Sequence, residues 1–309
     1  MIQKPKTVKK GDLIAVVSPA GAVEHAQIQS TLDLIKEYGY QPVLSPHALG
    51  RYEEGYAYSG TEEERISDLN WAFSNPSFSA IWATRGGYGC QHLLRHLKMP
   101  PLKKMPKWYI GYSDNTVIQS LLLKNNIASI HGQTLKTSSF GVTAEAYPMI
   151  FSLLEGQMPH YQFQHHHLNQ KGEAQGILVG GNLALIYALL GTPYSFNFKD
   201  KILFIEDIGE QFYALDRMLM ALDLAGVFRK IKGLVVGGMT NMGSEKDNPA
   251  YEASFDDKAY QIIAHRLKDY DFPIIYGFPN GHIYENLPLV IGAEVRMKVS
   301  PKAVSLTYQ

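Results

Sequence analysis

The chain has 309 residues, of which 45% are hydrophobic and 19% are charged, so it is long enough for two hydrophobic cores. Lysine and arginine together number 29, as do aspartate and glutamate, which leaves a formal net charge of zero. This balance argues against nucleic acid or an acidic membrane surface as a partner. A single cysteine, Cys90, excludes an internal disulfide and is compatible with a reducing compartment. Because the N-terminus lacks the apolar core of a signal peptide and no apolar run approaches the roughly 20 residues that span a bilayer, we expect a cytoplasmic protein.

The first half of the chain alternates between strand and helix patterns. Apolar and β-branched runs predict strands at residues 12–18, 41–45, 79–85, 107–112 and 127–132. Helical spacing predicts helices at residues 24–38, 61–75, 90–97 and 115–126. The second of these begins with a capping box, in which Thr61 is the N-cap and Glu64 follows three residues later. This alternation predicts βαβ units in a mostly parallel sheet with helices on both faces, which binds ligands at the carboxyl ends of its strands.

The middle of the chain is polar and irregular, which predicts a crossing between domains. We therefore expect an N-terminal α/β domain at residues 1–155, a linker at 156–175 and a C-terminal β/α domain at 176–309. The linker contains a histidine run, His165–His167, which we interpret as a solvated loop rather than a metal site because consecutive side chains diverge. The second half resumes strand and helix patterns and ends on two strand-like runs, which predict a hairpin.

A lone serine, Ser113, stands between the strand pattern at 107–112 and the helix pattern at 115–126. A side chain in such a turn points outward at the open edge of the sheet, and the first N–H groups of the helix have no intrahelical partner. These donors favour a negative oxygen, helped by the helix dipole. The turn therefore suits a nucleophile with an oxyanion site beside it. The local sequence leaves a second interpretation open, because serine is also a preferred N-cap.

A serine nucleophile needs a base and an acid that orients the base. Among 11 histidines, His282 lies in a turn rich in Pro, Gly and Asn after a strand pattern, where catalytic residues gather. His131 is the main competitor, because it belongs to the same sheet edge as Ser113. For the acid, Glu206 and Asp207 end an apolar strand pattern. An ordinary loop histidine and a solvated turn remain the alternatives at these positions.

The glycine-rich stretch at residues 84–90, "TRGGYGC", follows the third strand pattern. It allows close backbone approach and could present the N–H of Gly86 or Gly87 to an oxyanion. It is neither a Walker loop nor a G-x-G-x-x-G fingerprint, and Cys90 falls inside the following helix pattern, which indicates a structural role. The fingerprint is also absent after the first strand, where "SPAGAVEH" stands, and this argues against a dinucleotide-binding enzyme.

Seven short motifs extend along nearly the whole chain, in the order "IAVVSPAG", "TRGGYG", "IGYSD", "HGQ", "GGNLALI", "LFIEDIGEQFYALDRML" and "GHIYENLPLVIGAEV". Together they resemble the LD-carboxypeptidases, the serine peptidases of the S66 type, which include the microcin C self-immunity hydrolases. The resemblance implies a nucleophile at Ser113, an acid at Glu206 and a base at His282. It also implies oxyanion donors at the backbone N–H groups of Asp114 and Gly87.

The same resemblance implies the fold and the assembly. We expect an N-terminal flavodoxin-like, or class I amidotransferase-like, parallel sheet and a C-terminal swivelling β/α domain, with the active site in the cleft. Family members are usually homodimers, and the chemistry needs no metal and no organic cofactor.

The activity implied by the resemblance is cleavage of an L,D-peptide bond, which releases terminal D-alanine from the murein tetrapeptide in cell-wall recycling. A free carboxylate must then be recognised, and Arg85, beside the glycine stretch, is a candidate for a charge-assisted pair or else a surface arginine. One alternative is an immunity-type hydrolase that acts on an acyl-adenylate peptide with the same triad. Another is a non-catalytic binding protein on a two-domain scaffold.

Overall fold

In the computed structural model the chain divides into two units, and each is described here by itself. The structure describes residues 2–136, 145–243 and 255–309. Unit 1 comprises Met1–Gln157 and Leu287–Val290, and unit 2 comprises Met158–Asn286 and Ile291–Gln309. The chain therefore returns to unit 1 for four residues near its end, which the sequence patterns did not predict.

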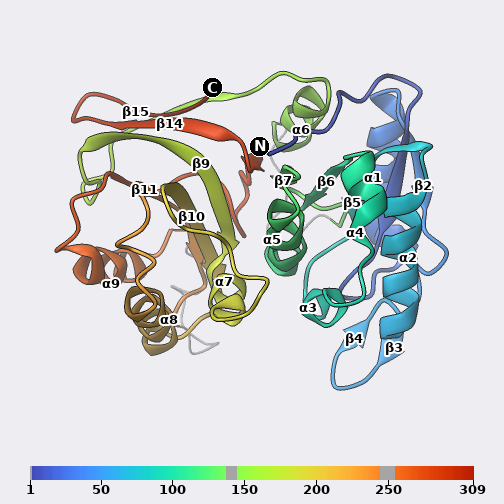
Figure 1. Cartoon of the computed structure of the whole chain (residues 1–309), viewed down its shortest axis with the longest axis horizontal. Helices are drawn as coiled ribbons and strands as arrows, with labels where there is room; N and C mark the ends of the chain where they lie inside the picture. Colours follow the sequence, from blue (N-terminus) through green and yellow to red (C-terminus); the bar gives the residue numbers. More distant parts are fainter. Residues whose placement is uncertain (1, 137–144, 244–254) are drawn as a thin grey trace. The chain divides into compact units, whose positions relative to one another are not determined.

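Unit 1 is built on a six-stranded sheet of order β13-β7-β6-β5-β1-β2 (Figure 1). Its strands are β1 (Leu13–Val17), β2 (Gln41–Leu44), β5 (Phe78–Ala83), β6 (Trp108–Gly111), β7 (Ser129–His131) and β13 (Leu289–Ile291). The first five, which the sequence predicted, pair in parallel. Numbered along the chain, these five lie in the order 2-1-3-4-5, so the connection direction reverses between β1 and β5. Parallel sheets bind ligands in the crevice at such a reversal. A short hairpin, β3 (Tyr52–Glu53) and β4 (Ala57–Tyr58), stands apart from the sheet.

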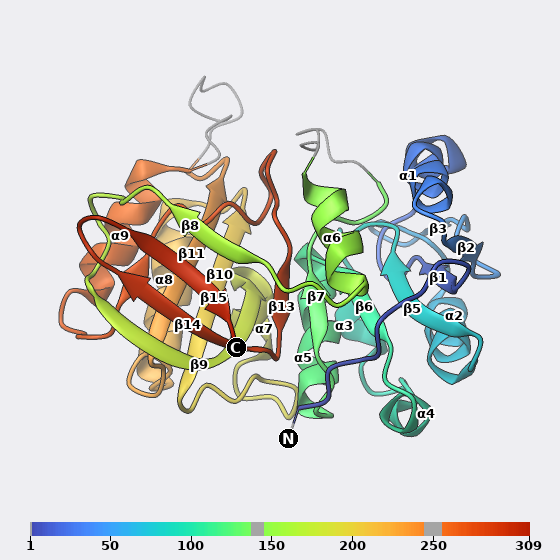
Figure 2. The ribbon, with the colours of Figure 1, turned by 90° about the horizontal axis from the view of Figure 1, so that it is seen from above.

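Helices cover both faces of this sheet, because the crossovers on either side of the reversal are right-handed. The helices are α1 (His25–Glu37), α2 (Glu62–Ser74), α3 (Cys90–Leu93), α4 (Met99–Lys104), α5 (Thr116–Lys124) and α6 (Ala146–Leu154). Figure 2 shows α1 and α6 on one face, where Tyr38 stacks on Phe151 at 4.0 Å. On the other face α3 adjoins both α2 and α5. The predicted capping box of α2 is confirmed, since Thr61 and Glu64 exchange hydrogen bonds of 3.2 and 2.8 Å.

Unit 2 combines parallel crossovers with antiparallel pairs in a seven-stranded sheet of order β12-β11-β10-β9-β14-β15-β8. Its strands are β8 (His160–Phe163), β9 (Gly172–Asn182), β10 (Lys201–Ile208), β11 (Gly233–Thr240), β12 (Ile274–Ile275), β14 (Glu294–Val299) and β15 (Val304–Tyr308). Strands β9 to β12 are parallel and are joined through α7 (Leu183–Leu189), α8 (Phe212–Leu224) and α9 (Asp257–Leu267), which adjoin one another on one face of the sheet (Figure 1). The predicted terminal hairpin is confirmed as the antiparallel pair β14–β15.

Two stretches differ from the expectation drawn from the sequence. The polar segment expected to be an irregular linker contains β8, which pairs with β15 and is therefore part of unit 2. The segment expected to be one helix at residues 90–97 is the short helix α3, and α4 follows as a second helix. For β8 a strand partner distant in sequence decides the outcome, whereas α4 begins at a local signal, a proline pair in its first turn.

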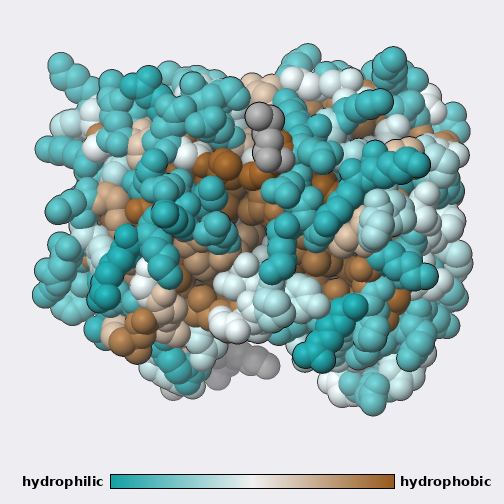
Figure 3. All heavy atoms as spheres, viewed as in Figure 1, coloured by the Kyte–Doolittle hydropathy of each residue, from teal (hydrophilic) through white to brown (hydrophobic). Residues whose placement is uncertain are grey.

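The surface of each unit is mostly polar on the face drawn in Figure 3, where hydrophilic side chains cover the outer helices. In the described part of the chain, no helix combines the length and the apolar character that crossing a bilayer would require.

Candidate active site

Ser113 lies in the turn between β6 and α5 of unit 1. Its φ of 62° is in the left-handed region, which non-glycine residues rarely adopt because Cβ crowds the carbonyl oxygen. The residue opens a 3-10 turn, Ser113–Asn115, that leads directly into α5. Such strain costs on the order of 1–3 kcal/mol and persists only where the surrounding structure enforces it. The sharp, strained strand-to-helix turn has the local geometry of a nucleophile elbow.

Ser113 is not the N-cap of α5, which was the other interpretation of the sequence. The cap position belongs to Asn115, and no side-chain hydrogen bond caps the turn or the helix. Within the described residues of unit 1, no hydrogen bond engages the Ser113 hydroxyl. The side chain is therefore held by the backbone of the turn, and its oxygen is available for chemistry.

The glycine loop, which we define as Arg85–Gly89, approaches Ser113 from the carboxyl end of β5. A Cβ built on Gly86 would lie 2.8 Å from Ser113 Cβ and 3.0 Å from Ser113 Oγ, so only glycine permits this approach. Gly87 has a φ of +113°, and a Cβ there would collide with the Tyr56 hydroxyl. The loop backbone thus lies directly against the serine, as an oxyanion donor must.

Arg85, at the start of the glycine loop, is half-buried and donates from Nη1 to the carbonyl oxygen of Ala22 at 3.1 Å. Lys136 lies beside it, since its backbone N–H donates to Thr84 O at 2.7 Å. Burial lowers the pKa of Lys136 and the Arg85 charge lowers it further, while the charge of Glu24 opposes that fall. Neither cation forms an ion pair with a carboxylate in the described part of the chain. Arg85 and Lys136 therefore place two positive charges beside each other just after the carboxyl end of β5.

His131, the competing base, ends β7 and is fully buried. Its Nδ1 lies 3.1 Å from Gln119 Oε1, and its ring meets the Tyr112 ring edge-on at 6.2 Å. An amide oxygen rather than a carboxylate faces this nitrogen, whereas in a serine triad an acid faces the Nδ1 of the catalytic imidazole.

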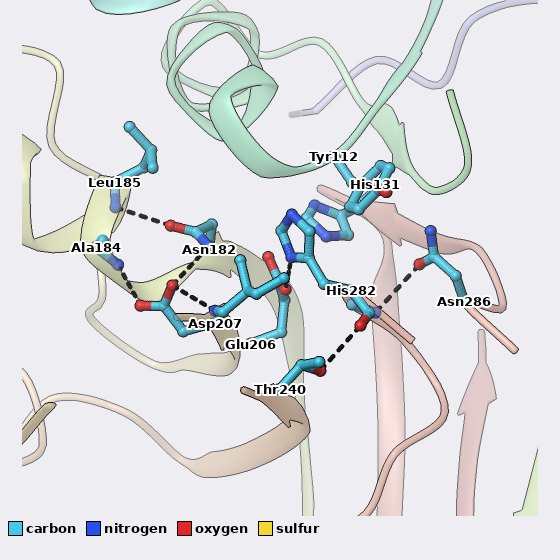
Figure 4. Close-up of polar contacts among 12 residues, drawn as sticks. Tyr112, His131, Asn182, Ala184, Leu185, Glu206, Asp207, Thr240, His282 and Asn286 are labelled. Carbon is cyan, nitrogen blue, oxygen red and sulfur yellow. Dashed lines mark hydrogen bonds and ion pairs between the residues drawn. The ribbon is translucent and has the colours of Figure 1, made fainter. Parts of the chain in front are cut away.

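In unit 2, Glu206 and His282 form a hydrogen-bonded pair (Figure 4). His282 Nδ1 lies 2.8 Å from Glu206 Oε2, and the side chains are 11% and 0% exposed, respectively. Because an ionised carboxylate only accepts hydrogen bonds, Nδ1 carries the proton and Nε2 of the neutral ring keeps its lone pair. The pair therefore presents a base whose tautomer is set by the acid.

Burial by itself would lower the pKa of His282, but the charge of Glu206 and its hydrogen bond raise the pKa above its ordinary value, with a further contribution from Asp207. A raised pKa makes the imidazole a stronger proton acceptor.

The loop that carries His282 is fixed to the carboxyl ends of β10 and β11. Thr240 Oγ1 donates to His282 O at 2.9 Å, and Asn286 Oδ1 accepts from Gly281 N at 3.1 Å (Figure 4). Gly281 has a φ of +125°, and a Cβ there would lie 2.9 Å from Glu206 Oε2. Glycine at this position therefore allows the carboxylate to reach the imidazole.

Asp207 faces away from this pair, because successive side chains of a strand point to opposite faces. Its carboxylate accepts from Asn182 Nδ2 at 2.9 Å, Ala184 N at 3.0 Å and Ile208 N at 2.8 Å, which ties β10 to the N-terminus of α7. Burial and then the charge of Glu206 raise the pKa of Asp207 to about 7. Of the two candidate acids, only Glu206 contacts the imidazole.

The histidine run lies elsewhere in unit 2. The rings of His166 and His167 stack at 4.5 Å, and His166 meets the Tyr260 ring edge-on at 5.5 Å. In the described ranges, no group of three or more His, Cys, Asp and Glu side chains could hold a metal ion.

Comparison with known proteins places both units in one family. The model of the LD-carboxypeptidase N-terminal domain matches residues 14–132, and that of the LD-carboxypeptidase C-terminal domain matches residues 175–297. A probable murein peptide carboxypeptidase of Bacillus subtilis is 31% identical over 97% of this chain and 92% of its own length. The chain belongs to the LD-carboxypeptidase family, peptidase family S66. It is therefore a serine hydrolase.

Solved structures agree with this membership. The muramoyltetrapeptide carboxypeptidase of Oxalobacter formigenes matches with a TM-score of 0.82 and 25% identity, over 96% of this chain and 98% of its own. By sequence, the microcin C7 self-immunity protein of Escherichia coli is also a relative, 24% identical over 97% of this chain and 94% of its own length. The two-domain α/β fold with mixed parallel sheets is thus that of the LD-carboxypeptidases.

Several residues around the candidate site escaped the sequence analysis. Gly281 and Thr240 hold the His282 loop, and Lys136 adjoins Arg85. The glycine directly before His282 is a signal that could have been used, because a turn that needs positive φ favours glycine. Lys136 carries no such signal, since only the sheet brings residue 136 beside residue 84.

Proposed function

We propose that this enzyme is a serine carboxypeptidase that cleaves an L,D-peptide bond and releases a terminal D-alanine from murein tetrapeptide. The observation that carries the proposal is Ser113, held in a left-handed conformation with the Gly86 backbone against its hydroxyl. A strained serine beside a glycine loop is what acyl transfer requires. The printed names of the Bacillus subtilis and Oxalobacter formigenes relatives support the substrate class.

In the proposed mechanism, Ser113 Oγ attacks the peptide carbonyl carbon while His282 Nε2 accepts the hydroxyl proton. Glu206 keeps the imidazole in the tautomer that can do so and stabilises the imidazolium. The N–H groups of Asp114 and Gly87 hold the tetrahedral oxyanion. His282 then gives the proton to the leaving amine, which departs as the free D-amino acid, and water hydrolyses the acyl-enzyme. The mechanism requires Ser113 Oγ and His282 Nε2 to meet within hydrogen-bond reach.

An exopeptidase must also recognise the terminal carboxylate of its substrate. We propose Arg85 for this role, with Lys136 as a second cation, because Arg85 begins the loop that lies against Ser113 and Lys136 adjoins Arg85. In the described part of the chain, neither forms an ion pair with a carboxylate. A guanidinium can bind a carboxylate through two parallel N–H donors, which fixes position as well as charge. The free carboxylate would then set which peptide bond lies against Ser113.

The test is to incubate the enzyme with murein tetrapeptide and with the same peptide amidated at its C-terminus, and to measure released D-alanine or D-alaninamide by mass spectrometry. We expect D-alanine from the free acid and a drop of roughly 100-fold or more in kcat/KM for the amide, since the amide offers no charge to the half-buried guanidinium. Ser113→Ala should lose about 10⁴-fold or more in rate. Retention of most peptidase activity in Ser113→Ala would remove the mechanism.

A second candidate is an immunity-type hydrolase of acyl-adenylate peptides, favoured by the full-length likeness to the microcin C7 self-immunity protein. It would use the same residues on a different amide. Comparing kcat/KM for murein tetrapeptide with that for an aminoacyl sulfamoyl adenosine separates the two, and faster turnover of the adenosine compound would favour the second.

We also propose the finer fold assignment, a flavodoxin-like unit 1, on the strand order 2-1-3-4-5, and a swivelling β/α unit 2. The homodimer and the cytoplasmic location stay predictions.

A further inference from the structure

The two residues that follow Ser113 both reach back to the glycine loop. Asp114 is 1% exposed and Asn115 is 0% exposed, so both side chains are buried from the solvent. Asn115 bonds the backbone of Arg85, where the Arg85–Gly89 loop begins, and Asp114 bonds the backbone of Cys90, directly after the loop ends. The turn that carries the serine and the loop that lies against it are therefore joined by side chains that are adjacent in sequence.

Asp114 holds the far end of the loop. Its Oδ2 accepts from the backbone N–H of Cys90 at 2.8 Å, and Cys90 is the first residue of α3. Burial raises the pKa of Asp114, and the bonds from Cys90 oppose that rise. Arg65 supports the same end, since its Nη1 donates to Gly89 O at 3.0 Å and to Pro19 O at 2.9 Å.

Asn115 holds the near end of the loop. Its Nδ2 donates to Arg85 O at 3.3 Å and to Tyr112 O at 3.0 Å, while its Oδ1 accepts from the Tyr109 hydroxyl at 2.5 Å. A Cβ on Gly111 would lie 2.8 Å from Asn115 Cγ, so the amide lies tightly against β6. The amide orientation is fixed by three partners.

We propose that Asp114 is a positioning residue for the oxyanion site, with Asn115 as its counterpart at the other end of the loop. This rests on the proposed function, in which the two oxyanion donors come from different connections, Asp114 N–H after β6 and Gly87 N–H after β5. Donors must lie about 2.7–3.1 Å from the developing oxyanion. The Asp114 carboxylate sets the distance between them, because its own backbone supplies one donor and its side chain anchors the loop that supplies the other.

The experiment compares Asp114→Ala with Asp114→Asn. The asparagine keeps an oxygen that can accept from Cys90 N–H, whereas the alanine does not. We expect Asp114→Ala to lose about 10- to 100-fold in kcat on murein tetrapeptide with KM within about twofold, since the displaced donor acts only in the transition state. Asp114→Asn should recover most of that loss.

The matched control is Asp68→Ala. Asp68 is another buried carboxylate of unit 1, which accepts from His47 N at 3.0 Å and from Ser45 Oγ at 2.6 Å and has no bond to the glycine loop. Asp68→Ala should lower the urea midpoint of unfolding but should not show the fall in kcat at nearly constant KM that we expect of Asp114→Ala. A merely structural Asp114 would behave as Asp68 does.

Asn115→Ser is the second variant, which applies if Asp114→Ala does not fold, and it should show the same fall in kcat at unchanged KM.

The rate of Ser113 labelling by a fluorophosphonate is measured alongside, since labelling needs the oxyanion site whatever the natural substrate is. Folded variants that keep wild-type kcat and labelling rate would overturn the proposal. A wild-type enzyme that labels at Ser113 but releases no D-alanine would refute the proposed substrate, and the labelling rates would still decide the role of Asp114. If the wild type does not label, the nucleophile fails and this inference fails with it.

Discussion

The left-handed conformation of Ser113 predicts that stability and activity can be separated at one position. We compare Ser113→Ala with Ser113→Gly. Both variants lack the hydroxyl, so both should be inactive as peptidases. They differ in backbone energetics, because the φ of 62° is strained for alanine and accessible to glycine.

The size of the difference follows from two opposing contributions. A left-handed conformation costs an L-residue other than glycine roughly 1–2 kcal/mol, while the greater freedom of glycine in the unfolded chain costs about 0.5–1 kcal/mol. We expect Ser113→Gly to be more stable than Ser113→Ala by about 1 kcal/mol, or about 2–4 °C in the melting temperature of a unit of this size.

The assay is urea unfolding of both variants, followed by far-UV circular dichroism and by tryptophan fluorescence. Ser30 is the control, since it lies on the exposed face of α1, where glycine should instead be less stable than alanine by about 1 kcal/mol. If Ser113→Ala proves as stable as Ser113→Gly, or more stable, then the turn is not strained and the argument for a built nucleophile position falls.

Three further predictions concern the remaining site residues. Glu206→Gln should lower kcat roughly 10⁴-fold and move the acid limb of kcat/KM to lower pH, because the carboxylate that raises the pKa of His282 is gone; a limb that stays in place in the pH–rate profile would contradict this. Gly86→Ala should lower kcat by about 10²-fold or more at unchanged fold, checked by circular dichroism, since its Cβ would lie 3.0 Å from Ser113 Oγ. Asp207 has a folded pKa of about 7 and an unfolded pKa of about 3.9, so the folded state keeps a proton that the unfolded state loses as pH rises from about 4 to about 7. The free energy of unfolding should fall across that window in the wild type and fall less in Asp207→Asn. Urea unfolding at a series of pH values measures it, and equal slopes of free energy against pH in the two proteins would refute the raised pKa of Asp207.

Local pattern was sufficient for most elements of unit 1. The five parallel strands and the capping box of α2 follow from apolar runs and from Thr61 and Glu64, because these signals act over a few residues. The strand β8 could not be read in the same way, since its four residues gain strand geometry only from pairing with β15. The return of Leu287–Val290 to unit 1 likewise depends on a partner far away in the chain.

For the candidate site too, local sequence predicted some features and tertiary packing decided the others. The sequence alone made Ser113, Glu206 and His282 candidates. A serine in a strand-to-helix turn, an acid at the end of a strand and a histidine in a glycine-containing turn are all local features. The local pattern could not choose between Glu206 and Asp207, nor exclude Ser113 as a cap; only the family resemblance favoured Glu206 as the acid and Ser113 as the nucleophile. Those choices depend on which face of β10 each carboxylate occupies and on one backbone angle, and both are set by the packing of segments that lie far apart in the chain.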